Sequence, residues 1–339
     1  MTMKLRFLAA LTLIAVLFTA PLSALRAEPD LDLPLEDDIE WETDDSETDW
    51  DGELLIESGF IPDDLPVVDE PYTADDRVVI GRDKRRPVLT SGYPYSTVGR
   101  IYRVSANGRE RGSCTGTLIG LNLVLTNAHC LPRQANNEQV ISGADYQRGQ
   151  GDRLVFKAGM IRGVARAQAR VVTFEHGWTD NRAAANDWAI LRLDQPLGRQ
   201  MGTLGWLGLD FTNPRILRET AGKLMVVSYS ADFPTPALQA FGQPGETAGQ
   251  HRRCSVVRAH NEGPNRGLIF HACDTNPGAS GSAILMRLDD GTYRVVGLHA
   301  GSNRFESAVR LPTGGRTDTL NRAVQVNRWH STAVRMRNQ

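Results

Sequence analysis

The chain has 339 residues, of which 41% are hydrophobic, and its formal net charge is −2. This length and composition fit a globular protein of one large or two small domains and argue against a disordered or fibrous chain. The net charge hides an asymmetry. Residues 28–76 hold 21 acidic and no basic residues, whereas residues 77–339 hold 19 acidic and 35 basic residues, a net charge of +16.

Residues 1–27 are predicted to be a secretory signal peptide. Lys4 and Arg6 supply the positive start, and the apolar run 7–20 is short for a membrane span. Cleavage is expected after Ala24 or three residues later; the alternative is an uncleaved N-terminal anchor. No later stretch is apolar enough to cross a membrane, so we expect a secreted or periplasmic protein with no transmembrane span after signal cleavage.

Residues 28–76 form a strongly acidic segment that we expect to be disordered in isolation. Like charges repel one another, and the segment offers little apolar surface to bury. One interpretation is a solvating tail. The interpretation we favour is a pro-segment that docks on the basic part of the chain and masks it until it is cut away.

A basic stretch follows the acidic segment and indicates where such a cut falls. Lys84, Arg85 and Arg86 form a cluster just after the apolar run 78–81, Val-Val-Ile-Gly. We expect cleavage between Asp76 and Arg86, leaving a new N-terminus that packs against the domain. The alternative is that the cluster is an ordinary solvated patch.

The domain from 77 to 339 has the pattern of an all-β fold. Short apolar or alternating runs recur between turn signals, and Asp289–Thr292 is typical of a hairpin turn. About 250 such residues suit two packed six-stranded β-barrels. At the end, Asp318 is expected to cap a C-terminal helix running towards Trp329. The expected strands are 99–104, 114–119, 122–126, 170–174, 188–193, 223–229, 267–272, 283–287 and 293–299.

Four cysteines in a chain marked for export predict disulfides. Cys114 and Cys130 flank two strand-like runs that would lie side by side, and Cys254 and Cys273 bracket a second pair. We therefore predict the bonds Cys114–Cys130 and Cys254–Cys273, with free buried thiols as the alternative. The spacing lacks paired Cys-x-x-Cys motifs, so no metal and no cofactor are expected.

Three further motifs carry chemistry. Ser280 lies in the stretch 274–283, Asp-Thr-Asn-Pro-Gly-Ala-Ser-Gly-Ser-Ala, with glycine on both sides of the Ala-Ser pair. A serine hydroxyl needs a base, and the base needs an orienting carboxylate. His129 ends the strand-like run 123–128, and Asp187 opens a second run. Their order along the chain, His, Asp, Ser, is that of chymotrypsin-like proteases.

The motif around His129 resembles the trypsin/chymotrypsin family of serine proteases. The run 278–283, Gly-Ala-Ser-Gly-Ser-Ala, is more similar to the bacterial glutamyl-endopeptidase (V8-like) branch, as are 80–83 and 93–96. The resemblance covers roughly 78–330 and implies a chymotrypsin-like fold. Ala279 departs from trypsins, which place Asp there to bind the freed N-terminal amine, so activation by that buried ion pair is not expected.

The resemblance implies a role for each residue. Ser280 attacks the scissile carbonyl, His129 accepts its proton, and Asp187 orients the imidazole. The N–H groups of Gly278 and Ser280 form the oxyanion hole. Taken singly, these residues could be a turn serine, a core histidine and a strand-end cap.

The expected specificity pocket contains His299, in the run 295–302, and Thr275. The resemblance implies that both bind an acidic side chain, as in glutamyl endopeptidases, since an imidazole suits a carboxylate. Asp274 stands where trypsins bind Arg or Lys, so a basic preference stays open. Asp274 could also pair with His299 and leave neither available.

These observations predict an exported serine endopeptidase made as a pro-form, acting on peptides or proteins as a monomer. The alternatives are a catalytically silent, protease-like binding domain and a protease that prefers Arg or Lys. An esterase of the α/β-hydrolase type is disfavoured because its elbow motif is missing. No nucleic-acid motif accompanies the +16 charge, for which the chain's own acidic segment is the expected partner.

Overall fold

A computed structural model describes residues 55–68, 83–134, 139–179, 182–312 and 314–339. The chain divides into two compact units, 1–51 and 52–339, and every described residue belongs to the second. The predicted signal peptide and most of the acidic segment therefore lie outside the described residues. Among the described helices, none has the length and hydropathy needed to span a membrane.

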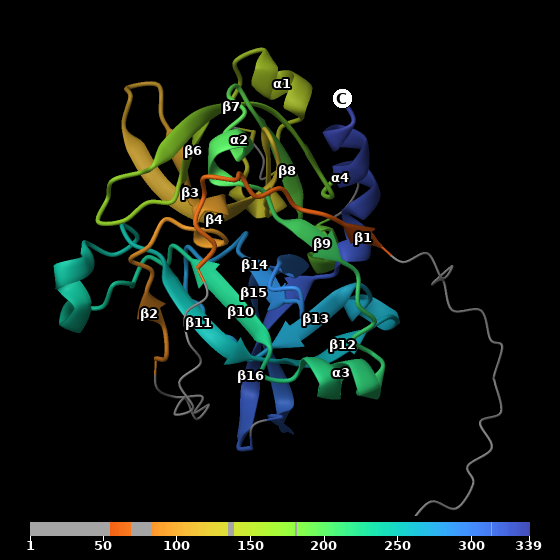
Figure 1. Cartoon of the computed structure of the whole chain (residues 1–339). Coiled ribbons are helices and arrows are strands. Elements are labelled where there is room, and N and C mark those ends of the chain that lie inside the picture. The colour runs from red at the N-terminus through yellow and green to blue at the C-terminus, as the bar shows by residue number, and fades with distance from the viewer. Residues whose placement is uncertain (1–54, 69–82, 135–138, 180–181, 313) are drawn as a thin grey trace, which may run out of the picture. The chain divides into compact units, whose positions relative to one another are not determined.

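The first half of the domain is a closed six-stranded antiparallel barrel (Figure 1). Side chains along its strands alternate between the two faces, so Leu154, Phe156 and Ala158 are buried while their neighbours are more exposed. These residues belong to the core that fills the barrel. In hydrogen-bonded order the strands are β3 (Val98–Val104), β4 (Glu110–Gly120), β5 (Leu123–Thr126), β8 (Ala189–Leu193), β7 (Ala167–His176) and β6 (Arg153–Ala158).

The second half is a ten-stranded sheet and not the second six-stranded barrel that was predicted, whereas the predicted all-β, chymotrypsin-like architecture of two packed β-structures is confirmed. Eight strands form one path that does not close on itself, while β1 (Ile56–Glu57) and β9 (Gly205–Leu207) attach beside β15. The path runs β12 (Val256–His260), β13 (Leu268–His271), β16 (Arg316–Val324), β15 (Tyr293–Arg310), β14 (Ala283–Arg287), β10 (Leu224–Ser228), β11 (Gly249–Cys254) and β2 (Arg86–Pro87).

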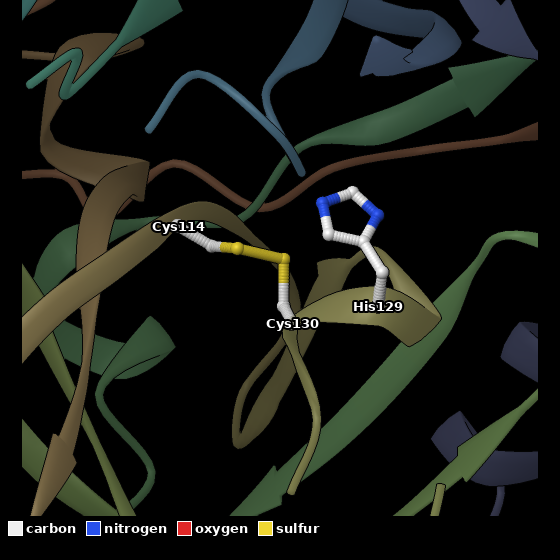
Figure 2. A group of neighbouring side chains, drawn as sticks. All are labelled: Cys114, His129 and Cys130. Atoms are coloured by element: carbon white, nitrogen blue, oxygen red, sulfur yellow. A yellow bond between two sulfur atoms is a disulfide. The ribbon is translucent and has the colours of Figure 1, made fainter. Parts of the chain in front are cut away.

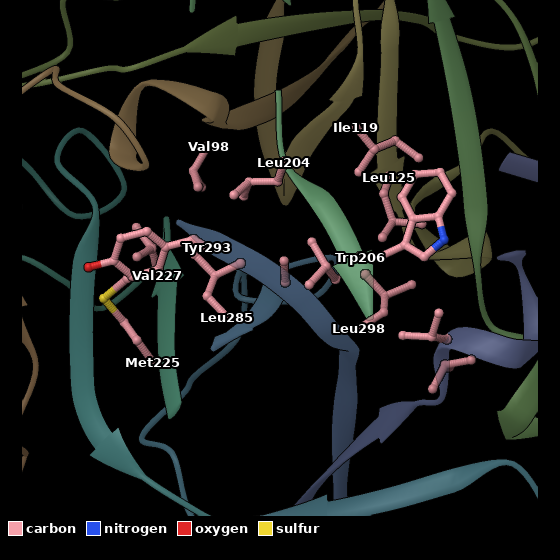
Figure 3. Close-up of a cluster of buried hydrophobic side chains, with 14 of the residues drawn as sticks. Val98, Ile119, Leu125, Leu204, Trp206, Met225, Val227, Leu285, Tyr293 and Leu298 are labelled. Atoms are coloured by element: carbon pink, nitrogen blue, oxygen red, sulfur yellow. The ribbon is translucent and has the colours of Figure 1, made fainter. Parts of the chain in front are cut away.

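One hydrophobic cluster joins the two halves (Figure 3). It is drawn from the barrel and from the sheet, including the short strand β9, and it adds to the separate clusters of the barrel and the sheet. Burying such side chains stabilises the fold by about 25 cal/mol per Å² of apolar surface. Its members include Val98, Ile119 and Leu125 of the barrel, Met225, Val227, Leu285 and Leu298 of the sheet, and Trp206 of β9.

Within the described ranges, helices are few and short. The four α-helices there are α1 (Gly143–Gln147), α2 (Gly198–Met201), α3 (Pro214–Thr220) and α4 (His330–Arg337). Six 3-10 turns accompany them, namely η1 (Tyr95–Thr97), η2 (Ala128–Cys130), η3 (Ala184–Asn186), η4 (Pro236–Phe241), η5 (Gly263–Asn265) and η6 (Val326–Arg328). Two of these turns, η2 and η3, lie directly beside candidate site residues.

The predicted C-terminal helix exists, but its predicted position is wrong. Residues 316–324 form strand β16, which pairs with β13 and β15, and the helix α4 begins only at His330. Asp318 caps no helix; its carboxylate accepts hydrogen bonds from Arg304 and Thr319. The apolar residues of this stretch are spaced as a helix face would be, and pairing with two strands overrode that local pattern.

Residues 55–68 are the described part of the acidic segment, which is expected to be disordered in isolation, and they adopt a defined conformation packed on the domain. Strand β1 pairs with β9, and Leu65 is buried in the cluster that joins the two halves. This part of the segment therefore contributes to the core of the domain. The expected cleavage region falls largely on residues 69–82, which lie outside the described residues.

Candidate active site

His129 lies on the turn η2, which follows the buried strand β5. Its Nδ1 lies 2.7 Å from Oδ2 of Asp187, and its backbone N–H donates to Oδ1 of the same carboxylate at 3.0 Å. The side chain of Asp187 is only 3% exposed, whereas that of His129 is 28% exposed. Because the carboxylate accepts at Nδ1, the proton of the neutral imidazole is assigned to Nδ1, which leaves Nε2 as the acceptor.

The position of Asp187 is fixed from two directions. It follows the turn η3 and precedes β8, which pairs with β5, the strand that leads to His129. The side chain of Asn127, which is fully buried, donates to the backbone carbonyl of Asp187 at 2.6 Å. The His–Asp pair is thus held by neighbouring strands of one closed barrel.

Both predicted disulfides, Cys114–Cys130 and Cys254–Cys273, are confirmed. The first ties β4 to the turn η2, and Figure 2 shows its sulfur atoms beside the turn from which the His129 ring projects. Closing a loop of this length restricts the unfolded chain and is worth about 3 kcal/mol in the loop-entropy model. The bond therefore helps hold the histidine turn against the barrel.

Ser280 lies on a turn that is attached to the same strand. Its carbonyl accepts a hydrogen bond from the N–H of Thr115 at 2.9 Å, next to the disulfide-bonded Cys114. Gly281 has a φ of +85°, and a Cβ there would come within 2.2 Å of the Thr115 carbonyl oxygen. Only glycine permits this approach. Two consecutive residues of β4 therefore hold the two turns. Cys114 is bonded to Cys130, next to His129, and Thr115 is hydrogen-bonded to Ser280.

In the described part of the chain, Ser280 Oγ and His129 make no hydrogen bond with each other. Catalytic hydrogen bonds are often long or poorly aligned without substrate. The N–H groups of Gly278 and Ser280 donate to no backbone carbonyl among the described residues, which leaves both available to a substrate oxygen. Gly278 has a φ of +99°, and a Cβ there would lie 2.7 Å from the Tyr229 carbonyl oxygen.

His299 runs beside this turn on β15. Its carbonyl accepts from the N–H of Gly281, and its own N–H donates to the carbonyl of Ser282. The ring is 3% exposed, and its Nδ1 lies 3.1 Å from Nε2 of His271. His271 Nδ1 accepts from the N–H of Cys273, so neutral His271 donates through Nε2 to His299. This assignment leaves the proton of His299 on its Nε2.

Burial lowers the pKa of His299 to about 3, and the neighbouring charges of His129 and Arg322 lower it in the same direction. Burial also holds the pKa of His271 well below its usual value. Both rings are therefore neutral near pH 7 and act as hydrogen-bonding groups rather than as charges.

Asp274 does not pair with His299, so that expectation is wrong. Its N–H donates to Nδ1 of His251 at 2.6 Å, and its carboxylate accepts from the N–H of Lys84 at 3.0 Å. His251 is buried on β11. His299 instead pairs with His271, so it keeps the Nε2–H described above.

Asp274 and Thr275 both line a pocket of about 370 Å³. Its one guanidinium, Arg85, is bound by two carboxylates, those of Asp83 and Asp232, through bonds of 2.7 to 2.9 Å. These contacts hold the pKa of Asp232 below its usual value, and Arg85 stays protonated. The other lining residues are Asn276 and Asn321.

Arg322 is a residue of this region that sequence reasoning missed. It lies on β16 opposite Gly301 of β15, and its charge contributes to the lowered pKa of His299. One nitrogen donates to Asn303 at 3.0 Å, while its buried Nε has no partner among the described residues. No local sequence signal marks Arg322, because its position depends on the pairing of two strands that the sequence did not predict to pair.

One group of metal-ligand residue types lies close together in the described part of the chain, namely Cys114, His129 and Cys130. Both sulfurs belong to the Cys114–Cys130 disulfide, so neither is a thiolate able to bind a metal ion. His129 alone supplies one nitrogen. The donor set therefore does not fit a metal site.

This chain has two packed β-structures, and one strand holds both a His–Asp pair and a serine turn. These are the features of a chymotrypsin-like peptidase. A family model described as a trypsin-like peptidase domain matches residues 114–298, more than half of the chain. The protein therefore belongs to the trypsin-like peptidase family, as its sequence predicted.

Two individual proteins are similar to this chain. A solved structure of Glu endopeptidase superimposes with a TM-score of 0.52 at 22% sequence identity, covering 77% of this chain and 100% of that chain. An "Extracellular metalloprotease" of Bacillus subtilis (strain 168) is 26% identical over 137 residues. That alignment covers 40% of this chain, and the chain spans only 40% of that relative.

The buried neutral histidines predict a loss of stability in acid. The unfolded chain binds a proton at His299 near pH 6.5, whereas the folded chain binds it only near pH 3. Stability contributed by this group is therefore present above about pH 6.5 and is lost as the pH falls towards 3, by up to about 1.4 kcal/mol per pH unit. Urea unfolding from pH 7 to pH 4.5 measures this slope.

We expect His299→Gln to reduce the slope in that range, with the 74% exposed Val164→Ala as the control that leaves it unchanged. An unaltered slope in His299→Gln would show that the ring is protonated in the folded protein.

Proposed function

We propose that this protein is an exported serine endopeptidase that hydrolyses peptide bonds through an acyl-enzyme and is made as a pro-form. The observation that carries the proposal is the contact between the buried carboxylate of Asp187 and Nδ1 of His129. This contact leaves Nε2 as a base, on the turn fastened to the strand that also holds Ser280. Family membership and the disulfides support the same conclusion.

In the proposed reaction, Ser280 Oγ attacks the scissile carbonyl while His129 Nε2 takes its proton. Asp187 stabilises the imidazolium, and the N–H groups of Gly278 and Ser280 stabilise the oxyanion, each such donor being worth about 3 kcal/mol. The imidazolium then protonates the departing amine, and the acyl group remains on Ser280. Water, deprotonated by His129, releases the second product and regenerates the serine.

Export and processing are supported by separate observations. Two disulfides suit an oxidising compartment, and the Bacillus subtilis relative is named as extracellular. For the maturation cut, the region 76–82 is a better candidate than the bonds after Lys84 and Arg85. Arg85 is held between two carboxylates, and Arg86 pairs with β11, so those bonds are not presented as an accessible extended strand.

Activity and processing are tested together by comparing the wild type with Ser280→Ala and Asp187→Asn, all expressed from residue 28. The wild type should digest denatured protein and start between Val78 and Pro87, as read by N-terminal sequencing and intact mass. Ser280→Ala should be inactive and should keep residues 28–76, because it lacks the nucleophile. Asp187→Asn should lower kcat about 10⁴-fold.

The control is Ser331→Ala, an exposed serine on α4 that should leave both readouts unchanged. An active Ser280→Ala protein would contradict the proposed nucleophile. An inactive, untrimmed wild type would favour the alternative, a silent protease-like binding domain.

For specificity we propose a preference for Glu or Asp before the scissile bond. Arg322 supplies a cation near His299, His299 supplies a neutral Nε2–H donor, and Thr275 lines the 370 Å³ pocket described above. A specific observation favours the alternative, an Arg or Lys preference, because three carboxylates line the 370 Å³ pocket that Thr275 also lines, and one, Asp274, is not bound to Arg85.

The two preferences predict opposite effects at Arg322 and Asp274. With an acidic preference, Arg322→Gln should lower kcat/KM for a Glu substrate about 10- to 100-fold, the usual worth of a charged hydrogen bond, while Arg322→Lys retains more activity. Asp274→Asn should raise kcat/KM, because it removes a repelling charge. Matched peptides with Glu, Gln or Arg before the bond measure this. Loss of Arg cleavage in Asp274→Asn, with Arg322→Gln unchanged, would establish the basic preference instead.

A further inference from the structure

Residues 55–68 lie along the domain through main-chain hydrogen bonds. Phe60 and Thr203 exchange two such bonds, at 3.0 and 2.6 Å. Upstream, the carbonyl of Leu55 accepts from the N–H of Gly208 at 2.9 Å, and β1 pairs with β9 between these points. Downstream, Tyr93 bonds to residues 66 and 68 at 2.8 Å each. Figure 1 shows β1 as the outermost strand beside β9.

Glycines of the domain make the groove in which this segment lies. A Cβ at Gly205 would come within 2.0 Å of the Glu57 carbonyl oxygen, and one at Gly92 within 2.6 Å of the Pro66 carbonyl oxygen. Real side chains do not approach a carbonyl oxygen so closely, so residues 55–68 fit because those two positions are glycine. The domain surface is thus shaped to the backbone of this one segment.

Side chains anchor the segment at both ends. Leu65 is 4% exposed, within the cluster that joins the two halves of the domain. At the other end, Arg337 of α4 lies 3.3 Å from the Glu57 carboxylate and donates to the Ser58 carbonyl at 3.2 Å. The same guanidinium stacks over Trp206, with 4.1 Å between its Cζ and the ring centroid. The segment therefore has both an apolar and a charged anchor.

The stretch 203–208, along which the segment lies, also links the two halves of the domain. Strand β9 lies beside β15 of the sheet, and the N–H of Leu204 donates to the Leu118 carbonyl on β4 of the barrel. If residues 55–68 dissociated, the backbone N–H and C=O groups of the stretch 203–208 would lose their partners on one side. The hydrophobic cluster would also lose Leu65. Exposed strand edges of that kind are unfavourable.

We propose that residues 55–68 stay bound after the maturation cut, so that the mature protein is a non-covalent two-chain complex. This proposal rests on the processing proposed above. Residues 55–68 are the segment that occupies the glycine groove. The N-terminal chain is a permanent strand of the sheet, and only the covalent link to the domain is lost. Before the cut, the link holds the segment at an effective concentration of about 1 mM; afterwards its own contacts must hold it.

The test uses residues 28–339 with Ser280→Ala, in which a foreign protease's recognition sequence replaces part of 69–82. After complete digestion and dilution to about 1 µM, far below the tethered concentration, the sample is run on a native size-exclusion column. We expect both fragments in one peak at a 1:1 ratio by intact mass, and their separation in denaturant. An N-terminal fragment that elutes alone would overturn the proposal.

Variants of the segment show whether the groove holds it. Leu65→Asp should lower the retained fraction about tenfold or more, since burying an unpaired carboxylate costs well over the 1.4 kcal/mol that a factor of ten requires. Val67→Ala, at a residue 50% exposed, should leave retention unchanged. If uncut Leu65→Asp does not fold, Gly59→Val takes its place, because its Cβ would lie 2.3 Å from the Thr203 carbonyl oxygen. Retention in the folded variant would contradict the groove as the binding site.

The design keeps this result separate from the proposed function. The cut is made by a foreign enzyme in a protein that lacks Ser280, so retention is measured whether or not the wild type is a peptidase. A wild type that never cuts itself would refute the processing and leave the binding result standing.

Discussion

Thr115 is the residue through which the barrel and the sheet meet at the candidate active site. It is fully buried, and four hydrogen bonds of 2.8 to 2.9 Å converge on it. Its N–H donates to the Ser280 carbonyl and its hydroxyl donates to the Gly278 carbonyl, so the serine turn is fastened to β4. Its hydroxyl also accepts from the Tyr229 N–H, which brings in the end of β10. These bonds therefore fix Ser280 relative to the strand that is disulfide-bonded to the His129 turn.

The neighbouring Cys114–Cys130 disulfide links the same strand, β4, to the turn that carries His129. One strand thus positions the serine through Thr115 and the histidine through Cys114, and the buried Asp187 orients the imidazole. Such preorganisation matters because most of the rate enhancement proposed here depends on dipoles that need not reorient during reaction. His271 and His299 are neutral near pH 7, so in the proposed specificity the charge selection comes from Arg322 or Asp274, which carry opposite charges.

Local chemistry explains what could be predicted from the sequence. His129, Asp187, Ser280 and the disulfides stand in motifs whose neighbours are themselves informative, such as the glycines around Ser280. The His271–His299 contact joins residues 28 positions apart on different strands, so no local pattern reveals it. The same holds for Arg322. The β16 strand was taken for a helix because its apolar spacing fits both, and only pairing with two neighbours decides between them.

The acidic segment 28–76 shows why composition alone does not predict structure. Its acidic residues predict disorder, and composition averages over a segment, whereas binding depends on a few positions. Leu65 and Gly59 are single residues in the charged stretch, yet they fit a groove that the domain supplies. The partner surface is formed by residues 92 and 202–208, far along the chain, so the sequence of the segment alone could not indicate that it folds.

In the proposed mechanism, the His129–Asp187 pair makes Ser280 a nucleophile. The most direct measurement is the intact mass of the protein after reaction with a fluorophosphonate probe, followed by mapping of the adduct. The account predicts one adduct, on Ser280, that forms in the wild type and is lost in Ser280→Ala and His129→Ala. A wild type that is folded yet unlabelled, or an adduct on another residue, would contradict it.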